Sequence, residues 1–219
     1  MYLGIDLGTS AVKTILVDDE QRVVASRNRP LTVASPRPGY SEQDPGDWID
    51  GVFATLDDLK ADHASELAAV DGIGLSGQMH GATVLDANFK PLRPCILWND
   101  GRSAAECGVL EQRWPALRMT TGNKAMPGFT APKVLWLAKH EPEIFAAIKL
   151  VLLPKAYLRL ILTGEPIEDV SDASGTLWLD VARRDWSDSG GVGGSLGQGR
   201  LECDRRDLET CAGDGLARG

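Results

Sequence analysis

The sequence predicts an α/β protein with a mixed sheet flanked by helices, and the order of its apolar segments carries that prediction. Three short apolar segments, Tyr2–Asp6, Val12–Val17 and Val23–Asn28, follow one another with only brief polar turns between them. This spacing is typical of an antiparallel meander. A long amphipathic pattern comes next, and short apolar segments then alternate with helical ones, as they do in α/β domains.

One long helix is expected directly after a loop rich in proline and glycine, Arg29–Ser41. It should begin at Asp44-Pro45, because aspartate caps a helix N-terminus and proline suits the first helical position. Apolar residues recur every three or four positions and predict one buried face, formed by Trp48, Val52, Leu56 and Leu59. Val70–Leu75 is then predicted to be a buried strand.

The remaining elements are shorter. Further strands are expected at Thr83–Leu85, Ile96–Trp98 and Lys149–Leu153, and helices at Ser103–Glu111, Thr130–His140 and Pro154–Thr163. Ser103 has the chemistry of an N-cap, and Gly164 stands where a helix C-cap glycine is expected.

Composition excludes several classes of function. The 219 residues are 43% hydrophobic, which is ample for a core, and their formal net charge of −8 disfavours a nucleic-acid partner. No apolar run reaches the length of a membrane span, and no secretory signal is recognisable, so a cytoplasmic protein without membrane contact is expected. The four cysteines lack zinc-site spacing, and no disulfide is expected.

The segment from Gly190 to Gly219 differs in kind, because it contains nine of the 24 glycines, no aromatic residue and no periodic pattern. A phosphate loop at Gly190–Ser195 is disfavoured, since no strand precedes it and no Lys-Ser/Thr pair closes it. We therefore expect residues 189–219 to be a disordered tail, with a composition typical of an out-of-frame reading of a GC-rich gene.

The first turn of the chain is the clearest candidate for a binding site. Gly8, Thr9 and Ser10 follow an apolar strand that ends at Asp6, and Lys13 lies on the next strand. Such turns direct backbone N–H groups at an anion, and glycine permits a close approach. Hydroxyl donors, a lysine charge and a carboxylate for hydrated Mg²⁺ indicate nucleotide chemistry. The alternative is an ordinary hairpin, because these residue types are common in turns.

Two further segments place polar side chains after predicted strands, where ligands bind in open α/β sheets. Ser76–Gly81 contains Gln78, Met79 and His80, and Leu97–Arg102 contains Trp98, Asn99 and Asp100. Amide and carboxylate groups suit sugar hydroxyls, with the Trp98 ring as an apolar face. His80 as a structural histidine and Asp100 as a turn residue remain the alternatives.

Six segments together, in order along residues 1 to about 188, resemble the N-terminal domain of the FGGY carbohydrate kinases. They are Asp6-Leu7-Gly8-Thr9-Ser10, Ser41-Glu42-Gln43-Asp44-Pro45, Gly77-Gln78-Met79-His80-Gly81, Trp98-Asn99-Asp100-Gly101-Arg102, Pro127-Gly128-Phe129-Thr130-Ala131-Pro132-Lys133 and Ser171-Asp172-Ala173-Ser174-Gly175-Thr176. The resemblance implies an actin/hexokinase-like (ribonuclease-H-like) ATPase fold. The Gln-Met-His-Gly segment favours the branch that phosphorylates D-xylulose over the glycerol kinases.

The resemblance also implies an activity and roles for the site residues. ATP would phosphorylate D-xylulose to D-xylulose 5-phosphate in xylose catabolism, with Asp6 helping to hold Mg²⁺. The phosphates would be surrounded by Gly8, Thr9, Ser10 and Lys13, and the sugar by Gln78, Met79, His80, Trp98, Asn99 and Asp100.

The chain also departs from the family. The general-base aspartate of the family and its C-terminal domain lie beyond the point where the resemblance stops, so the 219 residues are expected to be inactive alone. The full-length form is a possible homodimer. Two alternatives stay open: another pentulose or polyol kinase of the same family, and a non-catalytic sugar-binding fragment. An actin-like ATPase regulator is disfavoured, because such proteins need no Gln-Met-His-Gly segment.

Overall fold

The computed structural model describes residues 1–187 of the chain, and these residues cluster into two units. The first unit comprises Met1–Val33 and Gln43–Gln78. The second comprises Ala34–Glu42 and the described residues from Met79 onward. The predicted tail at 189–219 lies outside the described residues.

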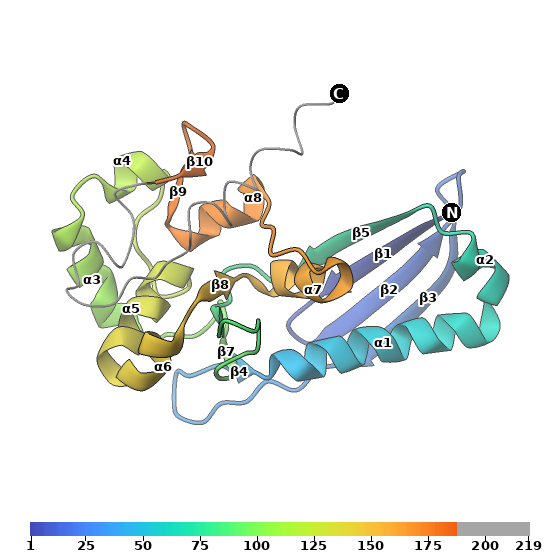
Figure 1. Ribbon diagram of the computed structural model, residues 1–219, viewed down its shortest axis with the longest axis horizontal. Helices are drawn as coiled ribbons and strands as arrows, with labels where there is room; N and C mark the ends of the chain where they lie inside the picture. Colours follow the sequence, from blue (N-terminus) through green and yellow to red (C-terminus); the bar gives the residue numbers. More distant parts are fainter. Residues whose placement is uncertain (188–219) are drawn as a thin grey trace. The chain divides into compact units, whose positions relative to one another are not determined.

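The first unit is built on a four-stranded mixed sheet (Figure 1). Its strands are β1 (Tyr2–Leu7), β2 (Ala11–Val17), β3 (Val23–Pro30) and β5 (Gly72–Gly77), in the order β3-β2-β1-β5. The first three are antiparallel neighbours, and β5 runs parallel to β1. The predicted meander and the mixed sheet are confirmed.

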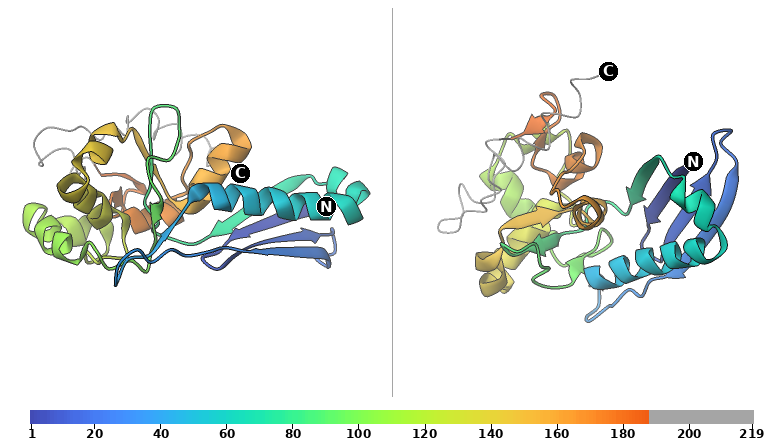
Figure 2. Two further views of the ribbon diagram at one scale, coloured as in Figure 1. Left: turned by 90° about the horizontal axis from the view of Figure 1, so that it is seen from below. Right: turned by 45° about the vertical axis from the view of Figure 1, so that its right-hand side comes forward.

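A single long helix, α1 (Pro45–Asp62), packs along β2 and β3, and Figure 2 shows it beside these strands. The Asp44 carboxylate accepts a hydrogen bond of 2.8 Å from the Gly46 N–H, so the predicted cap is confirmed. Alternate residues of the strands, such as Leu7 and Val12, are fully buried on the side that α1 covers. The fully buried residues of α1 itself are Trp48, Val52, Thr55 and Leu59. A short helix, α2 (Ala64–Ala68), follows.

The prediction of a buried strand at Val70–Leu75 is wrong in its burial and shifted in its bounds. The strand is Gly72–Gly77, and Ile73 is 55% exposed although it is aligned with the buried Leu3 of β1. The physical reason is position, because β5 is an edge strand while α1 covers β2 and β3, on the other side of β1.

The second unit combines short strand pairs with most of the helices. β6 (Thr83–Leu85) pairs antiparallel with β8 (Leu150–Leu152), and β9 (Leu179–Asp180) with β10 (Asp185–Trp186). Two further strands, β4 (Glu42–Gln43) and β7 (Cys95–Ile96), have two residues each. The helices are α3 (Ala104–Arg113), α4 (Leu117–Thr121), α5 (Thr130–His140), α6 (Pro142–Ala147), α7 (Pro154–Thr163), α8 (Val170–Ala173) and the 3-10 turn η1 (Ser174–Thr176).

One core cluster of this unit lies between α5 and the β6–β8 pair. It is formed by residues that are nearly inaccessible to solvent: Ala82, Val84, Ile96, Val134, Trp136, Leu137, Ile148 and Val151. α5 therefore presents a broad apolar face, as predicted. α7 has the predicted bounds, and Gly164 follows it at φ +79°, so the C-cap prediction is confirmed.

Two local predictions fail. The strand predicted at Ile96–Trp98 is only Cys95–Ile96, and the chain turns at Trp98 and Asn99, where the Asp100 N–H donates to the Leu97 carbonyl. The Ser103 side chain makes no cap to α3, because its hydroxyl donates instead to the Pro127 carbonyl at 3.3 Å. A local turn therefore ends the strand in the first case, and a tertiary contact replaces the cap in the second.

None of the helices in residues 1–187 combines the length and apolar character that a membrane crossing needs.

Candidate functional site

The predicted phosphate-binding turn lies in the first unit, between β1 and β2. Asp6 and Lys13 are directly opposite across these strands and are both exposed, on the face of the sheet that α1 does not cover. The Gly8 N–H donates to the Ala11 carbonyl at 3.0 Å, which closes the turn. A carboxylate and an amine are therefore presented side by side next to the turn.

Two buried glutamines hold this turn from within the first unit. The Thr9 hydroxyl donates to Gln78 Oε1 at 3.1 Å, and the Thr9 carbonyl accepts a hydrogen bond of 2.7 Å from Gln43 Nε2. Gln43 Oε1 in turn accepts from Gln78 Nε2 at 2.8 Å and from Trp48 Nε1 at 3.1 Å. Both amide groups are thus aligned by several partners, and the conformation at Thr9 follows from them.

The residues of the first unit fit a nucleotide phosphate with its metal ion. One exposed carboxylate, that of Asp6, suits Mg²⁺, which keeps several waters and takes few protein ligands. Lys13 supplies a cation on the same face, and Ser10 is exposed in the turn. In the first unit the structure therefore brings together Asp6, Gly8, Thr9, Ser10, Lys13 and, through its amide, Gln78.

The loop that follows Gln78 belongs to the second unit and contains a constrained histidine. His80 has φ +61°, a left-handed conformation that is uncommon for a residue other than glycine. Its ring lies 4.7 Å from that of Phe129, and a methyl group on Gly175 would collide with it. Burial, followed by the charge of Lys133, lowers the pKa of the His80 imidazole from its ordinary value. His80 is therefore half-buried, fixed and predominantly neutral near pH 7.

Asp100 is held in the interior of the second unit. It is 2% exposed, and its carboxylate accepts hydrogen bonds from the Ser41 N–H at 2.6 Å and from the Arg102 guanidinium at 2.8 and 2.9 Å. Arg102 also pairs with Glu42 at 2.7 Å and lies 3.9 Å above the Tyr40 ring. Asp100 is thus oriented to hold the turn that carries Trp98 and Asn99.

The other predicted sugar-binding residues of the second unit are accessible. Met79 is 53% exposed, Trp98 is 45% exposed, and Asn99 is also exposed. The ring and the thioether offer apolar surface, and the amide offers donors and acceptors for hydroxyl groups. This combination suits a small polyhydroxylated ligand.

Five further residues position the site without having been predicted to do so, and all five lie in the motifs quoted above. They are Gln43, Glu42, Arg102, Lys133 and Gly175. The motif spacing was a signal that these positions matter. Their roles depend on contacts between segments distant in sequence, which no local pattern contains.

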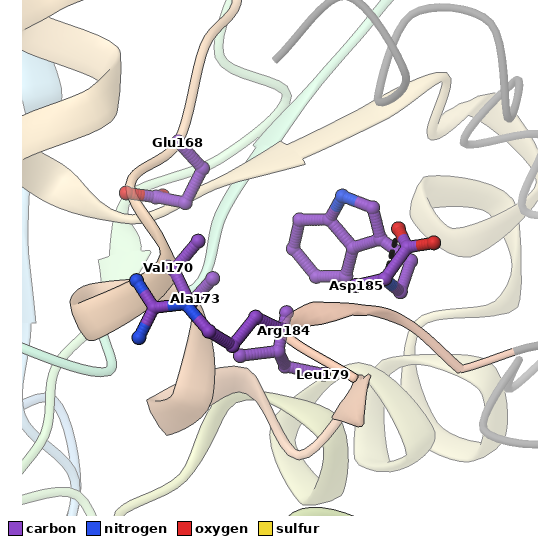
Figure 3. A pocket seen from close by; sticks show the side chains of 7 residues that line it. Glu168, Val170, Ala173, Leu179, Arg184 and Asp185 are labelled. Carbon is purple, nitrogen blue, oxygen red and sulfur yellow. Dashed lines mark hydrogen bonds between the residues drawn. The ribbon is translucent and has the colours of Figure 1, made fainter. Parts of the chain in front are cut away.

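A small pocket elsewhere in the second unit has a mixed polar and apolar lining (Figure 3). Beside it, the carboxylates of Glu168, Asp169 and Asp172 lie within 4.8 Å of one another, and burial raises the pKa of Glu168 to about 8. The Lys155 amine contacts Asp169 and lies 3.3 Å from Asp172, so it compensates part of this charge. The pocket is lined by Glu168, Val170, Ala173, Leu179, Arg184, Asp185 and Trp186.

The fold is that of a carbohydrate kinase N-terminal domain. The N-terminal domain of the FGGY family of carbohydrate kinases matches residues 1–190, and the chain belongs to this family. Its fold is accordingly the actin/hexokinase-like one, as the sequence predicts.

Individual members of the family resemble this chain to different degrees. The xylulose kinase of Escherichia coli K12 is 57% identical over 188 residues, which are 86% of this chain and 38% of that protein. The crystal structure of a xyloylose kinase from Brucella ovis superposes with a TM-score of 0.83 at 56% identity, over 85% of this chain and 39% of that one. Glycerol kinase from Plasmodium falciparum, solved with ADP, gives 0.77 at 25% identity, over 85% and 39% of the two chains. The chain thus spans about two-fifths of the length of these relatives.

Proposed function

We propose that this chain is the N-terminal part of a xylulokinase, which transfers the γ-phosphoryl group of ATP to D-xylulose and forms D-xylulose 5-phosphate. The observation that carries the proposal is the 57% identity to a xylulose kinase across nearly the whole described region. The exposed Met79, Trp98 and Asn99 and the fixed His80 support a sugar ligand.

The residues of the first unit would act on the phosphates. Phosphoryl transfer depends mainly on positioning and on stabilising charge, and Mg²⁺ supplies charge neutralisation when bound. Asp6 would hold the hydrated ion, while Lys13, Thr9 and Ser10 would donate to phosphate oxygens, with the turn at Gly8 allowing a close approach. Gln78, which is buried and bonded to Thr9, would serve the phosphate turn more directly than the sugar.

The residues of the second unit would select the sugar. Neutral imidazole can both donate and accept a hydrogen bond, which suits a hydroxyl group, and His80 is held with a lowered pKa. Asp100 would contribute through the turn that it fixes, since its carboxylate oxygens are already paired with Arg102 and Ser41.

The proposal is tested by replacing the corresponding N-terminal part of the E. coli xylulose kinase with residues 1–187 of this chain. We expect the chimera to release ADP in a D-xylulose-dependent manner. Asp6→Asn should remove that activity, whereas Asp57→Asn, an exposed position on α1, should not. A folded chimera that prefers glycerol or another pentulose would overturn the assignment in favour of a different kinase of the family.

We also propose that residues 189–219 are an out-of-frame continuation of the coding sequence. Their glycine-rich composition supports this, because it differs abruptly from that of the preceding residues. Sequencing the encoding DNA tests it: a single-base change that restores a long kinase-like frame supports the proposal, and an intact frame with no kinase sequence downstream contradicts it.

A further inference from the structure

A lysine is completely buried in the second unit, which is costly for a charged side chain. Lys133, in the first turns of α5, has no accessible surface, and burial lowers the pKa of its amine to about 7. Within residues 1–187 it forms no ion pair within 4 Å. Its Nζ donates instead to two backbone carbonyls, those of His80 at 2.8 Å and Gly128 at 2.7 Å. A group so expensive to bury indicates that these two contacts matter.

The first carbonyl belongs to the left-handed residue of the predicted sugar-binding loop. His80 has a left-handed backbone conformation, which is unfavourable in free energy for any residue that carries a side chain. Such a conformation persists only where the surrounding structure enforces it. The His80 carbonyl accepts from Lys133 Nζ and also from the Thr130 hydroxyl at 3.1 Å. Two donors from the start of α5 therefore hold this peptide in its orientation.

The second carbonyl connects the same amine to the turn that carries Trp98. Gly128 packs directly against that turn, because a Cβ at Gly128 would lie 2.8 Å from the Trp98 carbonyl oxygen. One lysine thus ties the His80 loop to the segment on which the Trp98 turn rests. The His80 loop and the Trp98 turn carry the side chains that we assign to the sugar.

We propose that Lys133 is a positioning residue that sets the spacing of the two sugar-binding loops by holding the carbonyls of His80 and Gly128 together. The amine itself is inaccessible, so it would act on the sugar only through these two carbonyls. The part of the inference that concerns sugar rests on the proposed function, whereas the tie between the loops does not.

The tie is tested on the whole 219-residue chain without sugar. Lys133→Met keeps the length and removes both hydrogen bonds, and Lys139→Met, an exposed position on the same helix, is the matched control. We expect faster amide hydrogen exchange at His80, Gly81 and Gly128 in Lys133→Met alone. The NMR titration midpoint of the His80 ring should rise in Lys133→Met and not in Lys139→Met, because the nearby charge of Lys133 is lost only in the former.

A measurement on the unchanged chain covers the case in which Lys133→Met does not fold. The ¹⁵Nζ–H signal of Lys133 should be protected from solvent exchange, unlike that of Lys139. Rapid exchange at Lys133, or a folded Lys133→Met with unaltered loop exchange and His80 titration, overturns the tie.

The role toward the sugar is tested in the chimera described above. Misplacement of binding loops by about 1 Å costs up to about 100-fold in rate, so Lys133→Met should lower kcat/KM for D-xylulose by about 10- to 100-fold. The KM for ATP should stay unchanged. If Lys133→Met were stable and its kcat/KM for D-xylulose were unchanged, Lys133 would serve only the stability of the fold and not sugar binding. An inactive parent chimera would instead count against the proposed function. The hydrogen-exchange experiment would still test whether Lys133 connects the two loops.

Discussion

At the scale of single residues, two parts of the candidate site are held in place by buried polar side chains. Thr9 is bonded by Gln43 and Gln78, and the turn of Trp98 and Asn99 is held by Asp100, which Arg102 fixes. Buried polar groups are expensive when unpaired, so each such pair is maintained as a unit. The site is therefore as sensitive to its hidden residues as to its exposed ones.

Gln43→Ala tests the first of these pairs. The change leaves Trp48 Nε1 and Gln78 Nε2 without their common acceptor, and an unsatisfied buried donor costs about 1–3 kcal/mol. We expect urea denaturation to give a free energy of unfolding lower by that amount. Gln112→Ala, at an exposed position of α3, should change it by less than about 0.5 kcal/mol. Equal effects of the two changes would contradict the amide network.

The raised pKa of Glu168 predicts that the stability of the protein depends on pH. Its pKa is about 8 in the folded protein and 4.5 ordinarily, so between these values the folded state binds more protons than the unfolded one. Stability conferred by this group therefore falls as the pH rises through that window. Relative to the parent, Glu168→Gln should gain stability with rising pH, by at most about 1.4 kcal/mol per pH unit.

The matched control for this measurement is Glu165→Gln, which lies at an exposed position close by in sequence. It should follow the parent at every pH in thermal denaturation. Parallel curves for the parent and Glu168→Gln would contradict the raised pKa.

At the scale of elements, capping residues and apolar periodicity predict where a helix or strand forms. How deeply it is buried depends on the elements that pack against it. α1 has its predicted cap, and its buried face contains Trp48, Val52 and Leu59 as predicted, with Thr55 rather than Leu56. α7 ends where Gly164 permits a left-handed residue. β5 shows the opposite case, because its Ile73 side chain is exposed at a sheet edge and Leu75 is only partly buried.

Gly164→Ala tests the termination of α7. At φ +79° a Cβ is strained by about 1 kcal/mol, although nothing lies within 4 Å of it. We expect the midpoint of thermal unfolding to fall accordingly. Gly74→Ala, in open space on β5 without a left-handed φ, should leave the midpoint unchanged or raise it. If Gly164→Ala left the midpoint unchanged, the left-handed conformation at residue 164 would not be needed to end α7.

At the scale of the whole molecule, the chain contains candidate groups for phosphate and sugar but spans about two-fifths of its relatives. Half of a substrate site supplies half of the contacts, while the entropic cost of ordering the ligands is unchanged. We therefore expect the 219 residues alone to release negligible ADP with D-xylulose and ATP. A coupled ADP assay with the chimera as positive control checks this, and turnover well above the sugar-free background would contradict it.

The sequence by itself determined the longer helices, the β1–β3 meander, the mixed α/β class and the family, but not the bounds of β5 and β7. These features follow from periodicity, from capping at Asp44 and Gly164, and from motifs such as Gln78-Met79-His80-Gly81, all of which are local. It also identified the segments of the site, although each residue's role in binding stays a prediction.

Only the tertiary structure decided which of these residues are exposed and what holds them. Asp100 turned out to be buried against Arg102, β5 to be an exposed edge, and Lys133 to bridge two loops. Such outcomes depend on hydrogen bonds and packing between residues that lie far apart in the chain. No local pattern contains them, because the free energy of a buried polar group depends on the partner that folding brings to it.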